Sequence, residues 1–176
     1  MPKVSATQRE RDGLILDASV AITIDFLGYV AALATLYTLY IPRQVKTELK
    51  DEDAKGKAGY TVPEREEVTV LRCKPSHYRD VRRQLQKGTG ETAVLALHLS
   101  SGYIVAIDEQ TPYRWAMRQG YPAFTSLHLL GEMHQAGLLD KPLGDEIDTL
   151  LANGWRLTKK LRDRAVKEYP RGETWI

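Results

Sequence analysis

Short apolar runs alternate with longer segments of helical periodicity along the chain. The runs are three to five residues long, as buried strands are, and the clearest covers 103–107. No two runs are joined by a two-residue hairpin turn, so the strands are expected to run parallel beneath helices, in an α/β fold. The expected strands are 14–16, 39–41, 68–72, 103–107 and 121–125, and the expected helices are 22–36, 43–50, 76–86, 91–99, one ending near 119, 127–135, 144–152 and 158–169.

Two segments stand apart from this alternation. Residues 51–67 are charged and contain glycine, which predicts an irregular excursion from the domain. The last expected helix carries five basic side chains, with Leu157, Leu161 and Ala165 spaced to pack on one face. It is therefore expected to dock as an amphipathic helix.

Composition narrows the class of protein. The chain has 176 residues, 43% hydrophobic and 27% charged, which is typical of one globular domain and excludes a disordered chain. Its one cysteine, Cys73, excludes internal disulfides, and its four histidines lack metal-ligand spacing. The start of the chain is polar, and the uncharged stretch 26–42 is too polar for a typical membrane span. A cytoplasmic protein that does not bind membranes is expected.

Basic side chains gather in two places, although the formal net charge is only +2. One is 72–87 and the other is 155–176. Either is a candidate for contacts to phosphate groups, and either has the plainer interpretation of a solvated face. The side chains predicted to bind RNA phosphates are Arg72, Arg79, Arg82 and Arg83.

Four carboxylates are candidates for chemistry. Asp17 and Asp108 each follow a buried strand, where ligands collect in open parallel sheets. Each equally suits a helix N-cap. Glu91 follows a Gly-Thr-Gly turn, where a negative charge favours the start of a helix, and Glu48 lies between two lysines as a surface glutamate would.

Taken together, these residues suggest a metal site. Aspartates and glutamates without histidine or cysteine select hard cations such as Mg²⁺ or Mn²⁺. An acidic pocket beside basic stretches suits metal-assisted hydrolysis of a phosphodiester bond. Periodicity does not show that the four carboxylates meet in space.

Four stretches of the sequence together resemble the PIN domain. They are LILDASVAI, YIPRQVKTELK, GTGETAVLALHLSSGYIVAIDEQ and FTSLHLLGEMHQAGLL, in that order. The resemblance implies a three-layer α/β/α sandwich and a metal-dependent endonuclease for single-stranded RNA. Many prokaryotic members are toxins of toxin–antitoxin pairs, which adds an antitoxin protein to the expected partners. The implied division is a polar segment 1–12, a PIN-like domain 13–140 and a helical extension 141–176 packed on it.

The resemblance also implies roles for single residues. Asp17, Glu91 and Asp108 match the metal ligands, and Glu48 matches the acid that orients the attacking water. Ser19 and Thr125 match supporting hydroxyls. Glu109, which stands where relatives often carry an aspartate, is also expected as a supporting residue. Tyr113 takes the place of an expected arginine, with Arg114 beside it.

Two other functions share features with this sequence. A catalytically silent PIN fold that binds RNA or a protein remains an alternative. It is favoured by the glutamate at position 109, where relatives often carry an aspartate. A phosphatase of the haloacid dehalogenase type is excluded, because it needs Asp-x-Asp after the first strand and the triplet here is Asp17-Ala18-Ser19.

The oligomeric state is a further expectation. The stretch 26–41 is more apolar than one helix of this domain needs, and its tyrosines suit an interface. We expect a homodimer that buries this surface; the alternative is that residues 141–169 cover it within one chain. The residues concerned are Phe26, Tyr29, Tyr37, Tyr40 and Ile41.

Overall fold

A parallel sheet organises the first part of the chain. The computed structural model describes residues 12–86 and 88–168, and within them a five-stranded sheet has the order β3-β2-β1-β4-β5 with every neighbouring pair parallel. This confirms the predicted α/β class. The strands are β1 (Gly13–Leu16), β2 (Thr38–Pro42), β3 (Val68–Leu71), β4 (Ile104–Ala106) and β5 (Ala123–Phe124).

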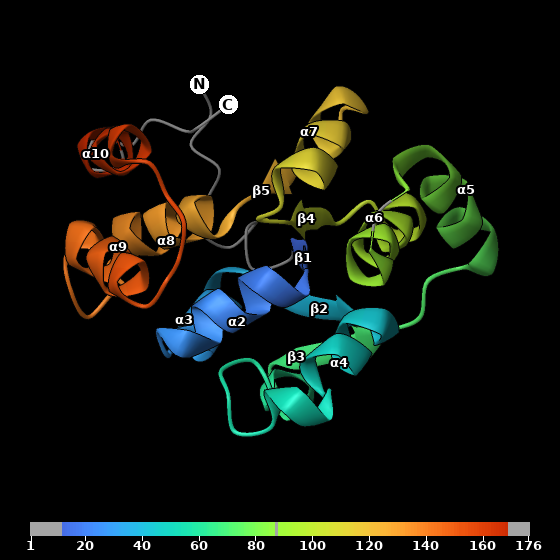
Figure 1. Cartoon of the computed structure of the whole chain (residues 1–176), viewed down its shortest axis with the longest axis horizontal. Coiled ribbons are helices and arrows are strands. Elements are labelled where there is room, and N and C mark those ends of the chain that lie inside the picture. Colours follow the sequence, from blue (N-terminus) through green and yellow to red (C-terminus); the bar gives the residue numbers. More distant parts are fainter. Residues whose placement is uncertain (1–11, 87, 169–176) are drawn as a thin grey trace. The chain divides into compact units, whose positions relative to one another are not determined.

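Helices cover both faces of the sheet. All four residues of β1 are buried, and because alternate side chains of a strand point to opposite faces, both faces must be covered. Figure 1 shows α2 (Ala18–Phe26) and α3 (Val30–Leu36) on one side of the strands, with α5 (Pro75–Leu85) and α6 (Thr89–Ser101) on the other. The three-layer arrangement is therefore confirmed. The remaining elements of this part are α4 (Arg43–Leu49), α7 (Gln110–Arg118), and the short helices η1 (Glu52–Ala54) and η2 (Val62–Glu64).

The strand order reverses beside the first strand. From β1 the chain moves outward through β2 to β3, and then returns to the other side of β1 to form β4 and β5. In open parallel sheets a crevice for ligands forms at such a switch point, outside the carboxyl ends of the strands. Asp17 and Asp108 follow the two strands that flank this point.

The predicted single helix over 22–36 is wrong. Two helices, α2 and α3, replace it and are bent by 113° with respect to each other. Gly28 lies between them with φ of +80°, a conformation that glycine adopts at no steric cost and that ends α2. In the part of the chain that the structure describes, no single helix is long and apolar enough to cross a membrane.

The same region does not present the expected interface tyrosines. Tyr29 and Tyr37 are each only 4% exposed, so both are buried within the chain and unavailable to a second copy. Tyr40 is half-buried and stacks on Tyr103 with 4.8 Å between ring centroids. Phe26 is the exposed member of the set.

The excursion 51–67 is held against α2. The carboxylate of Asp25 accepts hydrogen bonds from the backbone N–H of Gly59 at 2.7 Å and from Arg65 Nη2 at 3.0 Å. The ammonium of Lys50 lies 3.9 Å from the centre of the Tyr60 ring. The segment was predicted as irregular, and η1 and η2 are its regular elements; its docking on Asp25 was not predicted.

The second compact unit begins after Ser126, earlier than the expected boundary at 140. Its helices are α8 (Ser126–Gln135), α9 (Leu143–Ala152) and α10 (Lys159–Glu168). α10 packs against α9: Ala165 is fully buried, and the guanidinium of Arg162 makes two hydrogen bonds with the carboxylate of Asp148. The helix itself and the packing of Ala165 are confirmed, but Leu161, predicted on the packing face, is 37% exposed, and Leu157 is half-buried. The predicted end at Tyr169 lies outside the described residues, together with 1–11, 87 and 170–176.

Candidate active site

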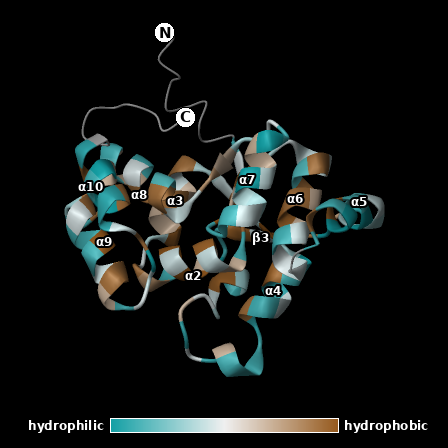
Figure 2. Cartoon of the chain, turned by 45° about the horizontal axis from the view of Figure 1, so that its top comes forward, coloured by the Kyte–Doolittle hydropathy of each residue, from teal (hydrophilic) through white to brown (hydrophobic). Residues whose placement is uncertain are grey.

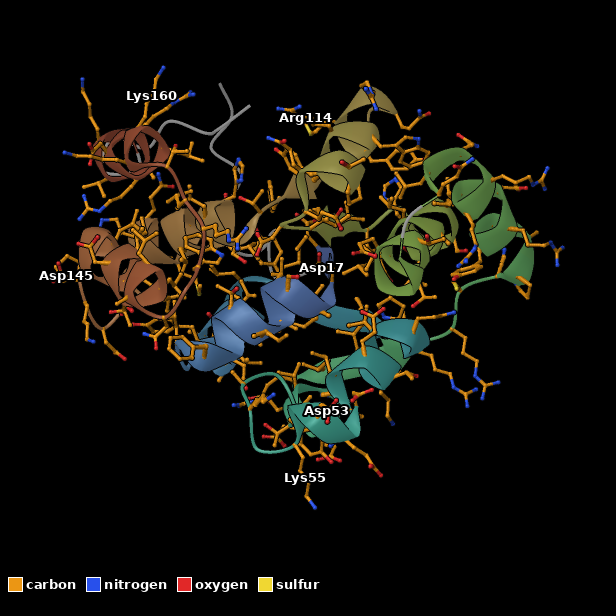
Figure 3. The ribbon with its side chains drawn as sticks, viewed as in Figure 1. Asp17, Asp53, Lys55, Arg114, Asp145 and Lys160 are labelled. Atoms are coloured by element: carbon orange, nitrogen blue, oxygen red, sulfur yellow. The ribbon has the colours of Figure 1, made fainter. Side chains whose placement is uncertain are left out.

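Asp17 lies at the junction of β1 and α2, in the middle of the sheet (Figure 3). Its backbone N–H donates to the carbonyl of Ala106 at 3.0 Å, which ties the end of β1 to the end of β4. Its carboxylate Oδ1 accepts from the N–H of Val20 at 2.7 Å, so Asp17 is the N-cap of α2. The side chain is nevertheless only 3% exposed, deeper than a surface cap requires.

Other carboxylates surround Asp17. Burial raises the pKa of Asp17 well above its ordinary value, and the negative charges of Asp108 and Glu91 raise this pKa further. Hydrogen bonds from the backbone of Val20 and Asp108 oppose this rise. The structure therefore brings together three of the four predicted acids.

Asp108 is held at the start of α8. Its Oδ1 accepts from the N–H of Ser126 at 2.7 Å, and its Oδ2 accepts from the Ser126 hydroxyl at 2.6 Å. Burial raises the pKa of Asp108, while these two hydrogen bonds act to lower it. The sequence pointed to Thr125 as the supporting hydroxyl. Thr125 is half-buried, and the neighbouring hydroxyl of Ser126, which is fully buried, contacts Asp108.

Glu91 is paired with a second glutamate. It lies in the first turn of α6, and its pKa is raised first by burial and then by a hydrogen bond and a negative charge from Glu109. The charge of Glu48 adds to the rise. Two carboxylates this close repel each other when both are ionised, so the proximity of Glu109 favours the protonated form of Glu91. Glu109, predicted as a supporting residue, therefore lies directly on Glu91.

Glu48 reaches from α4 to the start of α6. Its Oε1 accepts from the N–H of Gly90 and from the hydroxyl of Thr89, both at 2.9 Å. A β-carbon at position 90 would lie 2.5 Å from Glu48 Oε2, so glycine is what permits the approach. A plain surface glutamate would not need these contacts, although the Glu48 side chain is exposed to solvent. The acidic cluster is defined here as Asp17, Glu48, Glu91, Asp108 and Glu109.

The remaining predicted residues lie around this cluster or on the helix surface. Ser19 is exposed in the first turn of α2. Arg114 is exposed on α7 (Figure 3). The predicted RNA-binding arginines are all exposed, with Arg72 following β3 and the others on the hydrophilic helix α5 (Figure 2): Arg72, Arg79, Arg82 and Arg83.

The donor atoms of the cluster suit a hard divalent cation. In residues 12–86 and 88–168, no group of three or more His, Cys, Asp and Glu side chains is arranged to hold a metal ion as it stands. The chemistry of the set still fits Mg²⁺ or Mn²⁺, since every donor is a carboxylate oxygen. A cation there would also offset the repulsion that raises the pKa of Asp17.

A comparison with protein families decides the family. A family model described as a PIN domain matches residues 13–170, most of the chain and both compact units. The chain belongs to the PIN-domain family. No curated protein and no solved structure matches it. PIN domains are generally nucleases, so the PIN domain described here has a nuclease-type fold, and its acidic cluster lies where that fold places a ligand, at the carboxyl ends of β1 and β4.

Proposed function

We propose that this PIN domain is a metal-dependent endoribonuclease that hydrolyses phosphodiester bonds of single-stranded RNA. One observation carries the proposal: Asp17 is buried at the end of β1, where the strand order reverses, and the carboxylates of Asp108 and Glu91 lie near enough to add to the rise in its pKa that burial causes. Keeping several carboxylates together in a buried position costs stability, and a site that binds cations recovers that cost. A purely structural N-cap has no need of the other two acids.

Each acid has a role in this proposal. Asp17, Glu91 and Asp108 would hold Mg²⁺ or Mn²⁺, which when bound supplies an activated water and neutralises charge on the leaving oxygen. Glu48, fixed by Thr89 and Gly90, would orient the attacking water. Glu109 and Ser126 are positioning residues: the first hydrogen-bonds Glu91 and the second hydrogen-bonds Asp108.

The test is cleavage of a circular single-stranded RNA, which only an endonuclease opens. We expect the purified protein to linearise it with Mn²⁺ or Mg²⁺ and to stop when EDTA is added. Asp108→Asn should lower the rate by ~100-fold or more, because it removes a ligand charge from the site. Asp145→Asn is the matched control, since Asp145 is exposed in the first turn of α9, and it should cut at the parent rate.

The alternative, a silent domain that only binds RNA or a protein, gives a different result. It predicts RNA binding without cleavage in any divalent metal, and no difference between the parent and Asp108→Asn. The presence of Glu109 in place of the aspartate expected there is the feature that favours this alternative.

The proposal extends to a biological setting. We propose that the nuclease is the toxin of a toxin–antitoxin pair, with a small antitoxin protein as its partner. Induced expression of the chain in a bacterial host should then stop growth, and expression of the Asp108→Asn variant should not. Normal growth with a protein that is active in vitro would separate a stand-alone nuclease from a toxin.

A further inference from the structure

A cavity lies at the far end of the helices that begin at the acidic cluster. It has a volume of about 350 Å³ and lies among α5, the last turns of α6 and α7, and the loop between α7 and β5. Its walls include Leu99, Trp115 and Tyr121. Glu91 and Leu99 are eight residues apart on α6, so the cavity lies about 12 Å along that helix from the cluster. The cluster and the cavity are separate sites on one compact unit.

The lining combines aromatic surface with amide groups. Trp115 and Tyr121 meet edge to face with ring centroids 5.6 Å apart, and His98 packs on Tyr121 at 4.2 Å, so the aromatic wall is held rigidly. Gln84 and Gln119 are exposed at the cavity, and each amide offers both a donor and an acceptor. A planar ligand with a hydrogen-bonding edge fits such a lining.

The charges beside the cavity favour an anion. Arg83 of α5 lines the cavity and pairs with Asp80 at 3.0 Å, and its side chain is 77% exposed. Arg79 is one turn before Arg83 on α5, and Arg118 is three residues after Trp115 on α7, so each helix carries an exposed arginine within about one turn of a lining residue. Asp80 is the acidic residue among the lining side chains.

We propose that this cavity binds one nucleotide of a single-stranded RNA chain, away from the bond that is cut. The base lies against the half-buried ring of Tyr121, beside Trp115, which is only 8% exposed, with its edge on Gln84 and Gln119. The phosphate lies by Arg83. Unstacked bases of single-stranded RNA are recognised in this manner, by aromatic faces and amide groups together with arginine. The volume is at the small end of ligand pockets and suits one nucleotide. The inference rests on the proposed function, because it assigns the RNA a second point of attachment.

The experiment measures RNA binding without cleavage, by fluorescence anisotropy of a labelled single-stranded 12-mer in EDTA. Arg83→Gln and the double variant Gln84→Ala/Gln119→Ala should each weaken binding by about five-fold or more. Arg43→Gln is the matched control: it removes the same charge from an exposed position of α4, away from the cavity lining and from the basic stretch 72–87. Equal losses for Arg43→Gln and Arg83→Gln would show a general electrostatic effect and overturn the proposal.

A second measurement ties the effect to a base. Abasic sites are placed at each position of the 12-mer in turn. An abasic site at one particular position should weaken binding of the 12-mer to the parent protein. The same abasic site should not change binding to the double variant, because that variant has already lost the contact to the base. Adenosine monophosphate at millimolar concentration should compete weakly with the oligonucleotide, whereas stronger binding of the free nucleotide than of the 12-mer would identify a small-molecule site and overturn the RNA assignment.

Failure of this inference is distinguishable from failure of the proposed function. Cleavage of RNA with unchanged binding by the cavity variants would leave the nuclease in place and remove the nucleotide site. RNA binding that depends on the cavity residues, without cleavage, would support the nucleotide site and overturn the proposed nuclease activity. Unchanged RNA binding by every cavity variant would overturn the proposal. The cavity would then be a candidate site for a side chain of a partner protein.

Discussion

At the scale of single residues, Asp108 combines a structural contact with an electrostatic cost. Its two oxygens accept from the N–H and hydroxyl of Ser126, and burial still raises its pKa. Its negative charge also raises the pKa of Asp17. Neutralising Asp108 should therefore relieve repulsion while removing a metal ligand, and the two effects have opposite signs in stability.

Asp108→Asn should make the metal-free protein more heat-stable at neutral pH, by about 2–4 °C for each kcal/mol of repulsion relieved. An acid whose pKa is raised by folding binds more protons in the folded state than in the unfolded state. The free energy of unfolding of the parent therefore falls as pH rises from the unfolded pKa of the acid, about 4, to its higher folded pKa. The advantage of the variant should thus be absent near pH 3.5 and grow toward pH 7. Melting curves over this range measure it.

Metal provides the complementary measurement. Added Mn²⁺ should raise the melting temperature of the parent more than that of Asp108→Asn, because only the parent keeps the full set of ligands. Asp145→Asn should respond to Mn²⁺ as the parent does. Equal shifts in parent and Asp108→Asn would remove Asp108 from the metal site.

Gly90→Ala tests the placement of Glu48. The new β-carbon would displace the Glu48 carboxylate and break its bonds to Thr89 and Gly90, at about 1 kcal/mol. Alanine in place of glycine in a helix recovers about as much, so the free energy of unfolding should change by less than ~1 kcal/mol. RNA cleavage should fall at least ~10-fold, because the acid proposed to orient the water has moved. Glu48→Gln keeps an acceptor oxygen at the same place, so it separates the effect of losing the Glu48 charge from the effect of moving its side chain. Full activity of Gly90→Ala would show that Glu48 has no part in the chemistry.

At the scale of elements, the starts of three helices gather at the acidic cluster. The carboxylate of Asp17 caps α2, Glu48 accepts from the first turn of α6, and Asp108 accepts from the first residue of α8. Unpaired backbone N–H groups and the helix dipole both favour negative charge there. These contacts hold carboxylates in place that would otherwise repel one another, so the helices contribute to the site as much as the strands do.

Another element-scale contact is the docking of 51–67 on α2 through Asp25. Asp25→Ala should lower the free energy of unfolding by ~1–3 kcal/mol, because it leaves the Gly59 N–H and Arg65 without their acceptor. It should also speed tryptic cleavage at Lys55 and Lys57, measured by mass spectrometry. Asp53→Ala is the control, since Asp53 is exposed on η1, and it should change stability by less than ~0.5 kcal/mol. Equal effects of the two variants would show that Asp25 does not anchor the segment.

At the scale of the whole molecule, the expected homodimer now depends on a different surface. With Tyr29 and Tyr37 buried, the exposed apolar side chains of this region are Ile22 and Phe26, one turn apart on α2 and 41% and 43% exposed. Sedimentation equilibrium at tens of micromolar protein should show a dimer, and Phe26→Arg should shift it toward monomer. A parent protein that sediments as a monomer at that concentration contradicts the prediction.

Local patterns in the sequence predicted the α/β class, the order of the strands along the chain, most of the helices, and the placement of Asp17 and Asp108 at strand ends. These features follow from local periodicity and from the rule that parallel strands present their carboxyl ends at one edge. The bend at Gly28 was missed because apolar spacing continues through it.

Only the tertiary structure decided which groups hold the carboxylates. Ser126 lies 18 residues from Asp108 along the chain, and Gly90 lies 42 residues from Glu48. The cavity among α5, α6 and α7 likewise joins segments that have no common motif. Contacts of this kind depend on how helices pack on the sheet, and helix packing is fixed by the shapes of many side chains together, which no local pattern in a single sequence records.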